Sequence, residues 1–254
     1  MTTEFDSELD GHVAIVTGAS SGIGEATATS LVSEGASIVL AARRESELEE
    51  LAAQIEDEGG EALIVPTDLT DDTDIDALVD ATIDAHDRVD ILVNNAGLMP
   101  LAHIADVDRE TLQTTIDVNL SGLIKLTHAV IPTMVEQGSG HIVNLSSVVG
   151  RFSQPNSSHY DATKAGVIQF GESLRRDIAE AGIRVATIEP GAVNTELIEH
   201  IPDEEVQSAT EDLFESMEQL APEDIARTIT FVVTQPQRVD INEVLIRPTD
   251  QVQP

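Results

Sequence analysis

One stretch of the chain carries a hydroxyl, a phenol and an amine at spacings that a single active site could hold. Ser147 is followed thirteen residues later by Tyr160, the only tyrosine in the sequence, and Lys164 lies four residues further on. Positions four apart share one face of a helix. An ammonium beside a phenol favours the phenolate, so the pattern predicts a Tyr160 pKa below its ordinary value of about 10. Such a phenol is a general acid or base for an alcohol or a carbonyl.

A glycine-rich turn near the N-terminus predicts where a phosphate-bearing ligand binds. The apolar run Val13–Val16 leads into Thr17-Gly18-Ala19-Ser20-Ser21-Gly22-Ile23-Gly24, and a helical pattern follows. Glycine permits a tight turn and lets a phosphate approach the backbone, while the free N–H groups and the positive end of the helix dipole face the anion. A strand, a glycine turn and a helix in this order are typical of dinucleotide binding.

With two further motifs, NNAG and PG, the chain resembles the short-chain dehydrogenase/reductase family over nearly all of its length. The TGxxxGxG pattern is met by Thr17, Gly18, Gly22 and Gly24, NNAG by residues 94–97, and PG by Pro190 and Gly191. The resemblance maps the catalytic set to Asn119, Ser147, Tyr160 and Lys164. It also implies one doubly wound Rossmann domain over residues 1–254, an α/β fold whose seven parallel strands run in the order 3-2-1-4-5-6-7 with helices on both faces.

The alternation of short β-branched runs with longer helical patterns also predicts a parallel sheet covered on both faces. We expect strands at 12–17, 37–42, 61–66, 89–94, 140–146, 183–189 and 243–247. We expect helices at 22–34, 45–58, 72–86, 108–137 with a break or bend, 157–181, 196–218 in pieces, and 222–234.

The resemblance implies a mechanism. In the reducing direction Ser147 would hydrogen-bond the substrate carbonyl oxygen, Tyr160 would protonate it, and the nicotinamide would deliver hydride to the carbon. Lys164 would lower the Tyr160 pKa and hold the nicotinamide ribose, while Asn119 would bend its helix and support a water relay to the lysine. Ser146 is close by, but the spacing to Tyr160 favours Ser147. The alternative is a non-catalytic sensor or scaffold that binds NADP, because fold does not decide function.

The end of the second expected strand favours NADP over NAD. An NAD-binding chain usually places an acid there for the ribose 2′-OH, and that acid would repel a 2′-phosphate. Here Ala42 ends the strand and two arginines follow. Arg43 can offer a planar fork to phosphate oxygens, with Ser20 or Ser21 adding a hydroxyl. We expect Arg44 to be a solvated residue of the next helix, and an NAD-dependent dehydrogenase stays as the alternative.

The other cofactor contacts follow from the resemblance. Asp68 would hydrogen-bond the adenine amine, with Leu69 supplying backbone, although Asp68 could instead cap the next helix. Val193 and Thr195 would meet the carboxamide and the pyrophosphate. The remaining expected contacts are Gly18, Gly22, Ile23, Gly24, Asn95, Ala96, Gly97, Pro190 and Gly191.

The substrate is expected to be a small alcohol or hydroxy acid, converted to the matching ketone or aldehyde. Its pocket would be lined by residues 98–101, by Val149, Arg151, Phe152 and Gln154, and by the loop 192–220. Arg151 could hold a substrate carboxylate, but an arginine there is more often a surface or interface residue. The C-terminal segment 242–249 resembles the branch with NADP-dependent 3-hydroxy acid and serine dehydrogenases.

Composition narrows the other classes of function. The chain has no cysteine, and its seven histidines lack metal-ligand spacing, so we expect no disulfide and no metal site. The N-terminus shows no signal segment, and no run approaches the length of a membrane span, so we expect a cytoplasmic protein. The resemblance further implies a homotetramer formed through the helices expected at 108–137 and 157–181 and the C-terminal strand.

The net charge of −34, from 47 acidic and 13 basic residues, is far outside the usual range for a folded chain of 254 residues. The acids are spread through most of the sequence, which indicates an acidic surface rather than a disordered tail. With eleven arginines, two lysines and 2% aromatic residues, the composition is typical of a halophilic protein. Nucleic acids and anionic membranes are unfavourable partners, since their phosphates need a basic face.

Salt should therefore stabilise the protein. Carboxylate repulsion opens the fold when counterions are scarce, and it is screened when the Debye length falls to about 3 Å in molar salt. We expect the melting temperature and the activity to rise with potassium or sodium chloride from tens of millimolar into the molar range. Lowering the pH toward the carboxyl pKa of about 4 should partly replace salt. A melting temperature that is flat or declines between roughly 0.1 and 3 M salt would contradict the halophilic interpretation.

Overall fold

Runs rich in valine, isoleucine and leucine form one parallel sheet in the computed structural model, which describes residues 8–252. The strands are β1 (Val13–Thr17), β2 (Ser37–Ala42), β3 (Ala62–Pro66), β4 (Ile91–Asn94), β5 (Gly140–Leu145), β6 (Ile183–Pro190) and β7 (Glu243–Ile246). Their order is β3-β2-β1-β4-β5-β6-β7, and every pairing is parallel. The predicted fold class and strand order are confirmed. The N-terminal segment that entered the sequence argument lies outside the described residues.

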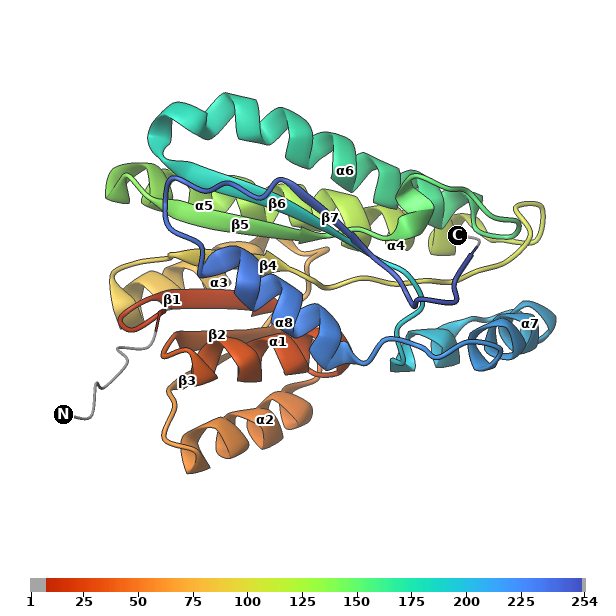
Figure 1. Ribbon diagram of the computed structural model, residues 1–254, viewed down its shortest axis with the longest axis horizontal. Helices are drawn as coiled ribbons and strands as arrows, with labels where there is room; N and C mark the ends of the chain where they lie inside the picture. Colours follow the sequence, from red (N-terminus) through yellow and green to blue (C-terminus); the bar gives the residue numbers. More distant parts are fainter. Residues whose placement is uncertain (1–7, 253–254) are drawn as a thin grey trace.

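Helices cover both faces of the sheet (Figure 1). α1 (Gly22–Ser33), α2 (Glu45–Asp57) and α8 (Pro222–Val233) pack in one apolar cluster with Ala14 and Val16. α3 (Asp72–His86), α5 (Leu123–Gln137) and α6 (Ser158–Ile178) pack in a second cluster with Val13 and Ile15. Alternate residues of a strand point to opposite faces, so β1 supplies both clusters. Its complete burial is typical of a parallel strand between two helix layers.

The helix expected at 108–137 has the predicted bend. It consists of α4 (Arg109–Ile116), a π-helical segment η1 (Asp117–Gly122) and α5, with Asn119 buried in the π segment. The 29 residues Arg109–Gln137 are long and apolar enough to cross a membrane by length and composition. The expectation that no run approaches such a length is therefore wrong. Leu123, Leu126 and Val130 are buried on this helix, and α5 packs on α3, as in a core helix.

The region expected to be helical in pieces at 196–218 contains a 3-10 turn η4 (Glu196–His200) and α7 (Glu204–Glu215). All side chains of α7 are at least partly exposed, and the helix stands apart from the sheet at the right of Figure 1. Two further 3-10 turns are η2 (Val148–Gly150), after β5, and η3 (Ala179–Ala181), after α6. The loops after β1, β4, β5 and β6 all leave the same edge of the sheet, where open parallel sheets bind ligands.

A buried histidine in β5 makes the fold sensitive to acid. His141 is 2% exposed, and neither ring nitrogen has a hydrogen-bond partner among the described residues. Burial, with a smaller contribution from the charge of Arg184, lowers the pKa of His141 from 6.5 to about 3. Below pH 6.5 the His141 side chain binds a proton in the unfolded chain but stays neutral in the folded protein. The folded state therefore loses stability as the pH falls from 6.5 toward 3.

We expect His141→Leu to weaken this acid dependence. The melting temperature of the parent protein should fall between pH 7 and pH 5, whereas that of His141→Leu should fall less, whatever its value at pH 7. Carboxylates stay charged between pH 7 and pH 5, so the relief of their repulsion expected near a pH of about 4 does not interfere with the effect of His141. The exposed His103→Gln serves as the control. Parallel curves for all three proteins would rule out His141 as the group responsible.

Candidate active site

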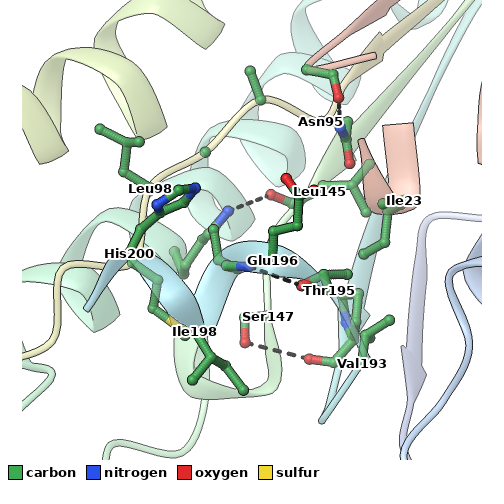
Figure 2. Close-up of a pocket in the computed structure, with 18 of the residues that line it drawn as sticks. Ile23, Asn95, Leu98, Leu145, Ser147, Val193, Thr195, Glu196, Ile198 and His200 are labelled. Atoms are coloured by element: carbon green, nitrogen blue, oxygen red, sulfur yellow. Dashed lines mark hydrogen bonds between the residues drawn. The ribbon is translucent and has the colours of Figure 1, made fainter. Parts of the chain in front are cut away.

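A cavity of about 670 Å³ opens at the carboxyl edge of the sheet. It is lined by the loops after β1, β2, β3, β4, β5 and β6, by the N-terminal part of α6, by η4 and α7, and by residues 250–252 of the C-terminal segment. Its size is in the usual range for small-molecule and cofactor sites. All of the predicted catalytic and cofactor-binding residues line it except Gly24 and Asn119. In Figure 2, Ile23 and Asn95 lie at one end and Leu98, Ile198 and His200 at the other.

The glycine turn has the geometry that phosphate binding requires. Gly18 has a φ of +65°, and a Cβ there would stand 2.9 Å from the Cα of Ala96, so a side chain is excluded by conformation and by space. Ser21, the N-cap of α1, makes no side-chain capping bond, which leaves the first N–H groups of the helix available to an anion. Gly24 lies outside the cavity because its role is packing: a Cβ would stand 2.1 Å from the carbonyl oxygen of Gly18.

Two polar side chains join the glycine turn to the end of β4. The hydroxyl of Thr17 accepts from the backbone N–H groups of Asn95 (3.0 Å) and Ala96 (3.1 Å). The amide of Asn95 donates to the carbonyl oxygens of Thr17 (2.9 Å) and Gly18 (3.2 Å). Asn95 therefore holds the turn in place. Sequence reasoning missed this role of Thr17, although the residue opens the TGxxxGxG motif.

The basic end of the cavity differs from the prediction. Arg43 lines the cavity as expected, but Arg44 lines it too. The Arg44 guanidinium donates to the hydroxyls of Ser21 (2.7 Å) and Ser20 (3.0 Å) and pairs with Glu196 (3.2 Å). The expectation that Arg44 is only solvated is wrong, since the close approach of η4 and the glycine turn gives its side chain three partners. Glu196 was missed because the contact spans residues distant in sequence.

Asp68 lies where an adenine contact was predicted, at the end of β3. Its carboxylate accepts from the backbone N–H (2.9 Å) and the hydroxyl (2.8 Å) of Thr70. Burial opposes a low pKa, but these two bonds and the charge of Arg43 lower the pKa of Asp68. The alternative role as N-cap of α3 is excluded, because Asp71 occupies that position and accepts from Thr73.

Ser147, Tyr160 and Lys164 meet at the centre of the cavity. The Lys164 amine lies 5.7 Å from the centroid of the Tyr160 ring and donates to the carbonyl oxygen of Leu145 (2.9 Å). The Ser147 hydroxyl donates to the carbonyl oxygen of Pro190 (3.3 Å), as Figure 2 shows. The Ser146 hydroxyl is instead committed to the carbonyl oxygen of Lys164 (2.8 Å). The geometry agrees with the choice of Ser147 over Ser146.

The pKa of Tyr160 is shifted in the direction opposite to the prediction. Burial raises the pKa of Tyr160, the charge of Asp161 raises it further, and a hydrogen bond with Ser147 opposes the shift. Burial also lowers the pKa of Lys164 to about 8. Both groups favour their neutral forms when water is excluded, so the expected phenolate–ammonium effect is overcome. Near neutral pH, Tyr160 is a protonated donor.

The direct side-chain partners of Asn119 are Leu98 and Thr163. Its side-chain oxygen accepts from the Leu98 N–H (2.7 Å), and its amide donates to the Leu98 carbonyl oxygen (2.8 Å) and to the Thr163 hydroxyl (3.3 Å). The π segment places the side chain between the loop after β4 and helix α6. In this arrangement Asn119 positions that loop; a relay through water stays a prediction.

Arg151 is held away from the cavity. It pairs with Glu189, which is fully buried at the end of β6, and with Glu243 of β7. These two carboxylates raise the pKa of Arg151. Of the other residues predicted to line the substrate pocket, Leu98, Met99, Val149 and Gln154 do so, whereas Pro100, Leu101 and Phe152 do not. Gln251, which sequence reasoning missed, accepts from the Ala192 N–H (3.0 Å) and brings the C-terminal segment to the cavity.

The raised pKa of Tyr160 can be measured directly, because the chain has one tyrosine and no tryptophan. We expect the tyrosinate absorbance of the cofactor-free protein to appear with a midpoint above the ordinary 10.0. Asp161→Asn should lower this midpoint by removing a nearby negative charge, whereas Asp177→Asn, an exposed change on the same helix, should not. Circular dichroism must show that the fold persists. A midpoint below 10.0 in the parent protein would restore the original expectation.

Comparisons with known proteins agree with this geometry. The pattern of the short chain dehydrogenase family matches residues 12–206. An uncharacterised oxidoreductase of Staphylococcus haemolyticus is 40% identical over 242 residues, which cover 95% of this chain and 99% of the relative. An alcohol dehydrogenase from the archaeon Thermococcus sibiricus, complexed with 5-hydroxy-NADP, superposes with a TM-score of 0.86 at 25% identity, over 96% and 99% of the two chains.

A second solved structure, the closed form of a serine dehydrogenase complexed with NADP⁺, superposes with a TM-score of 0.85 at 33% identity, over 92% of this chain and 94% of the other. The strand order, the glycine turn and the Ser147–Tyr160–Lys164 constellation thus coincide with a family match over most of the chain. The protein is a member of the short-chain dehydrogenase/reductase family of oxidoreductases.

Proposed function

We propose that the protein is an NADP(H)-dependent oxidoreductase that interconverts a small alcohol and the matching ketone or aldehyde. One observation supports it above the others: a proton donor, a hydroxyl and an anion-binding turn line the same cavity. The names of the structural neighbours cover an alcohol and a hydroxy amino acid as substrates, and both neighbours were bound to an NADP form. The neighbours therefore support the cofactor more strongly than the substrate.

The cavity fits a dinucleotide phosphate at its basic end. Gly18 and the first residues of α1, Gly22 and Ile23, line the cavity, so the uncapped N-terminus of α1 would face the pyrophosphate. Arg43, Arg44 and the hydroxyls of Ser20 and Ser21 would hold the 2′-phosphate. The contacts of Arg44 support this preference for NADP, because its guanidinium donates to both serine hydroxyls and so places a cation beside the two hydroxyls that would donate to a phosphate.

The chain's own residues would handle the oxygen and the proton. Ser147 would donate to the substrate carbonyl oxygen and orient it, and Tyr160 would transfer its proton to the same oxygen. When bound, the reduced nicotinamide supplies hydride to the carbonyl carbon. A raised Tyr160 pKa keeps the phenol protonated near neutral pH, which suits carbonyl reduction, whereas alcohol oxidation needs the phenolate and so a higher pH. Lys164 would hold the ribose hydroxyls beside the phenol.

The expected homotetramer stays a proposal. Large apolar side chains are exposed on the helix expected at 108–137 and on the C-terminal strand, whereas Val167 and Leu174 of α6, the other helix predicted to form an interface, are buried within the chain. Ile116 of α4 and Val135 of α5 are 44% and 48% exposed, and Leu245 of β7 is 41% exposed. A further one, Phe231 of α8, is 58% exposed. These exposed apolar side chains support association of copies of the chain through the surfaces on which they lie.

Replacing Tyr160 with Phe keeps the ring and removes the proton donor. We expect kcat for a carbonyl substrate to fall by at least ~10²-fold, while NADPH binds with unchanged affinity. Oxidation of NADPH can be followed by its absorbance with a panel of ketones and aldehydes, and binding by fluorescence of the reduced nicotinamide. Full activity in Tyr160→Phe would refute the mechanism. If the unaltered protein binds NADPH but none of the ketones and aldehydes causes its oxidation, the sensor alternative is favoured.

Arg44 should contribute to cofactor choice as strongly as Arg43. We expect Arg44→Ala and Arg43→Ala each to raise the KM for NADPH by about tenfold, as for loss of a charge-assisted hydrogen bond, and to leave the KM for NADH nearly unchanged. Arg109→Ala, an exposed change on α4, is the control. A parent enzyme that prefers NADH would show that the interpretation of both arginines is wrong.

A further inference from the structure

The part of the cavity around Tyr160 is apolar. Tyr160 packs in a buried cluster with Met99, Val148 and Val149, and the partly buried Leu197 packs against that cluster. Met99, Val149 and Leu197 also line the cavity, so a substrate beside the phenol touches mainly hydrocarbon. Figure 2 shows Leu98 and Ile198 at this same end. The substrate end thus excludes water from whatever binds there.

The cations of the described cavity lining are at the other end or already engaged. They are Arg43, Arg44 and Lys164. Arg43 and Arg44 follow β2, and Arg44 is bonded across the glycine turn. The Lys164 amine, whose pKa is lowered by burial, donates to the carbonyl oxygen of Leu145. Arg151, considered from the sequence as a binding partner for a substrate carboxylate, is outside the lining and is paired with Glu189 and Glu243.

The acidic groups of the same lining disfavour an anion. Asp250 of the C-terminal segment lines the cavity, as does Glu196 of η4, whose carboxylate is paired with Arg44 at the basic end. The net charge of the whole chain is −34. His200 is the remaining titratable group near this end and is exposed. A carboxylate that entered beside Tyr160 would lose its hydration, which is costly in an apolar environment. The cation beside the phenol, Lys164, is bonded to the Leu145 carbonyl oxygen and, in the proposed function, holds the ribose hydroxyls, so the carboxylate would gain no cationic partner of its own.

We propose that the substrate is an uncharged alcohol or ketone that carries an apolar group next to the reacting carbon, and that hydroxy acids are selected against. This proposal rests on the proposed oxidoreductase function. The reaction itself balances in the usual way: the ketone takes one hydride from NADPH at carbon and one proton from Tyr160 at oxygen, and the solvent returns the proton. The chemistry at the carbonyl group is the same for both kinds of substrate. The cavity discriminates between them by how it binds the rest of the molecule, which is either uncharged or a carboxylate.

Matched substrates that differ in charge test the proposal. Acetoacetate, acetoacetamide and methyl acetoacetate share the reacting ketone, and the amide has nearly the size of the acid. We expect kcat/KM to be at least ~10-fold higher for the amide and the ester than for the acid, because the acid lacks a cationic partner. Equal or faster turnover of acetoacetate would overturn the proposal alone. Failure of all three, and of longer apolar ketones, to oxidise bound NADPH would overturn the proposed function as well.

A cation placed in the lining should change the preference. Leu197→Arg adds a charge to the substrate end, and Leu197→Gln adds polarity without charge. We expect Leu197→Arg to raise the ratio of kcat/KM for acetoacetate to that for acetoacetamide by about tenfold relative to Leu197→Gln, as for gain of an ion pair in a poorly solvated site. The ratio is compared within each variant, so a general loss of activity does not affect it. An unchanged ratio would show that charge does not limit the acid.

Discussion

The active site depends on the hydrogen bonds that join helix α6 to the end of β5. The buried amine of Lys164 donates to the Leu145 carbonyl, and the Ser146 hydroxyl donates back to the Lys164 carbonyl. These bonds connect residues 18 and 19 positions apart in opposite directions, so the helix can neither slide nor rotate against the strand without leaving buried polar groups unpaired. Ser147, the second residue after β5, is thereby held near Tyr160, which lies four positions before Lys164 on the helix.

The same bonds explain why the phenol is protonated. Lys164 donates to its backbone partner, and burial lowers its pKa to about 8, so the amine loses its proton before the phenol titrates and does not lower the Tyr160 pKa in the cofactor-free protein. Asp161, the neighbour of Tyr160, is 6% exposed and accepts from Ser157 and Gln154. It stabilises the turn before α6 and adds negative charge near the phenol. The local electrostatics therefore favour a donor that is ready to reduce a carbonyl.

The few arginines of this acidic chain include three that pair with carboxylates at positions that hold the fold or the site together. Arg88 pairs with the buried Asp90, and Arg151 joins the buried Glu189 to Glu243 of the edge strand. Arg44 connects the glycine turn to η4 through Glu196. Its side chain is 41% exposed, so this pair contributes little to stability and is screened by salt. The pair instead holds the Arg44 guanidinium between the glycine turn and η4, in the lining of the cavity.

Much of the protein could be predicted from the sequence because its signals are local. β-branched runs, glycines before a helix and a tyrosine four residues before a lysine each depend on neighbours in the chain, and the resemblance placed them in one strand order. The sequence, with that resemblance, therefore determined the fold class, the break in the helix that holds Asn119 and the predicted site residues that meet in the cavity. Gly24, which packs behind the turn, and Asn119 lie outside its lining. Thr17 and Gln251 act through partners about 80 and 60 residues away in sequence, beyond the reach of a local pattern.

Only the tertiary structure decided how charge is distributed within that site. Arg44 was expected to be solvated and binds Ser20 and Ser21, while Arg151 was a candidate for a substrate carboxylate and is paired with Glu189. The Tyr160 pKa is raised where the Tyr–Lys spacing predicted a lower value. Spacing on a helix shows which groups are near each other, but the sign of a pKa shift and the partner of a charge depend on desolvation and on contacts between distant segments, which exist only once the chain has folded.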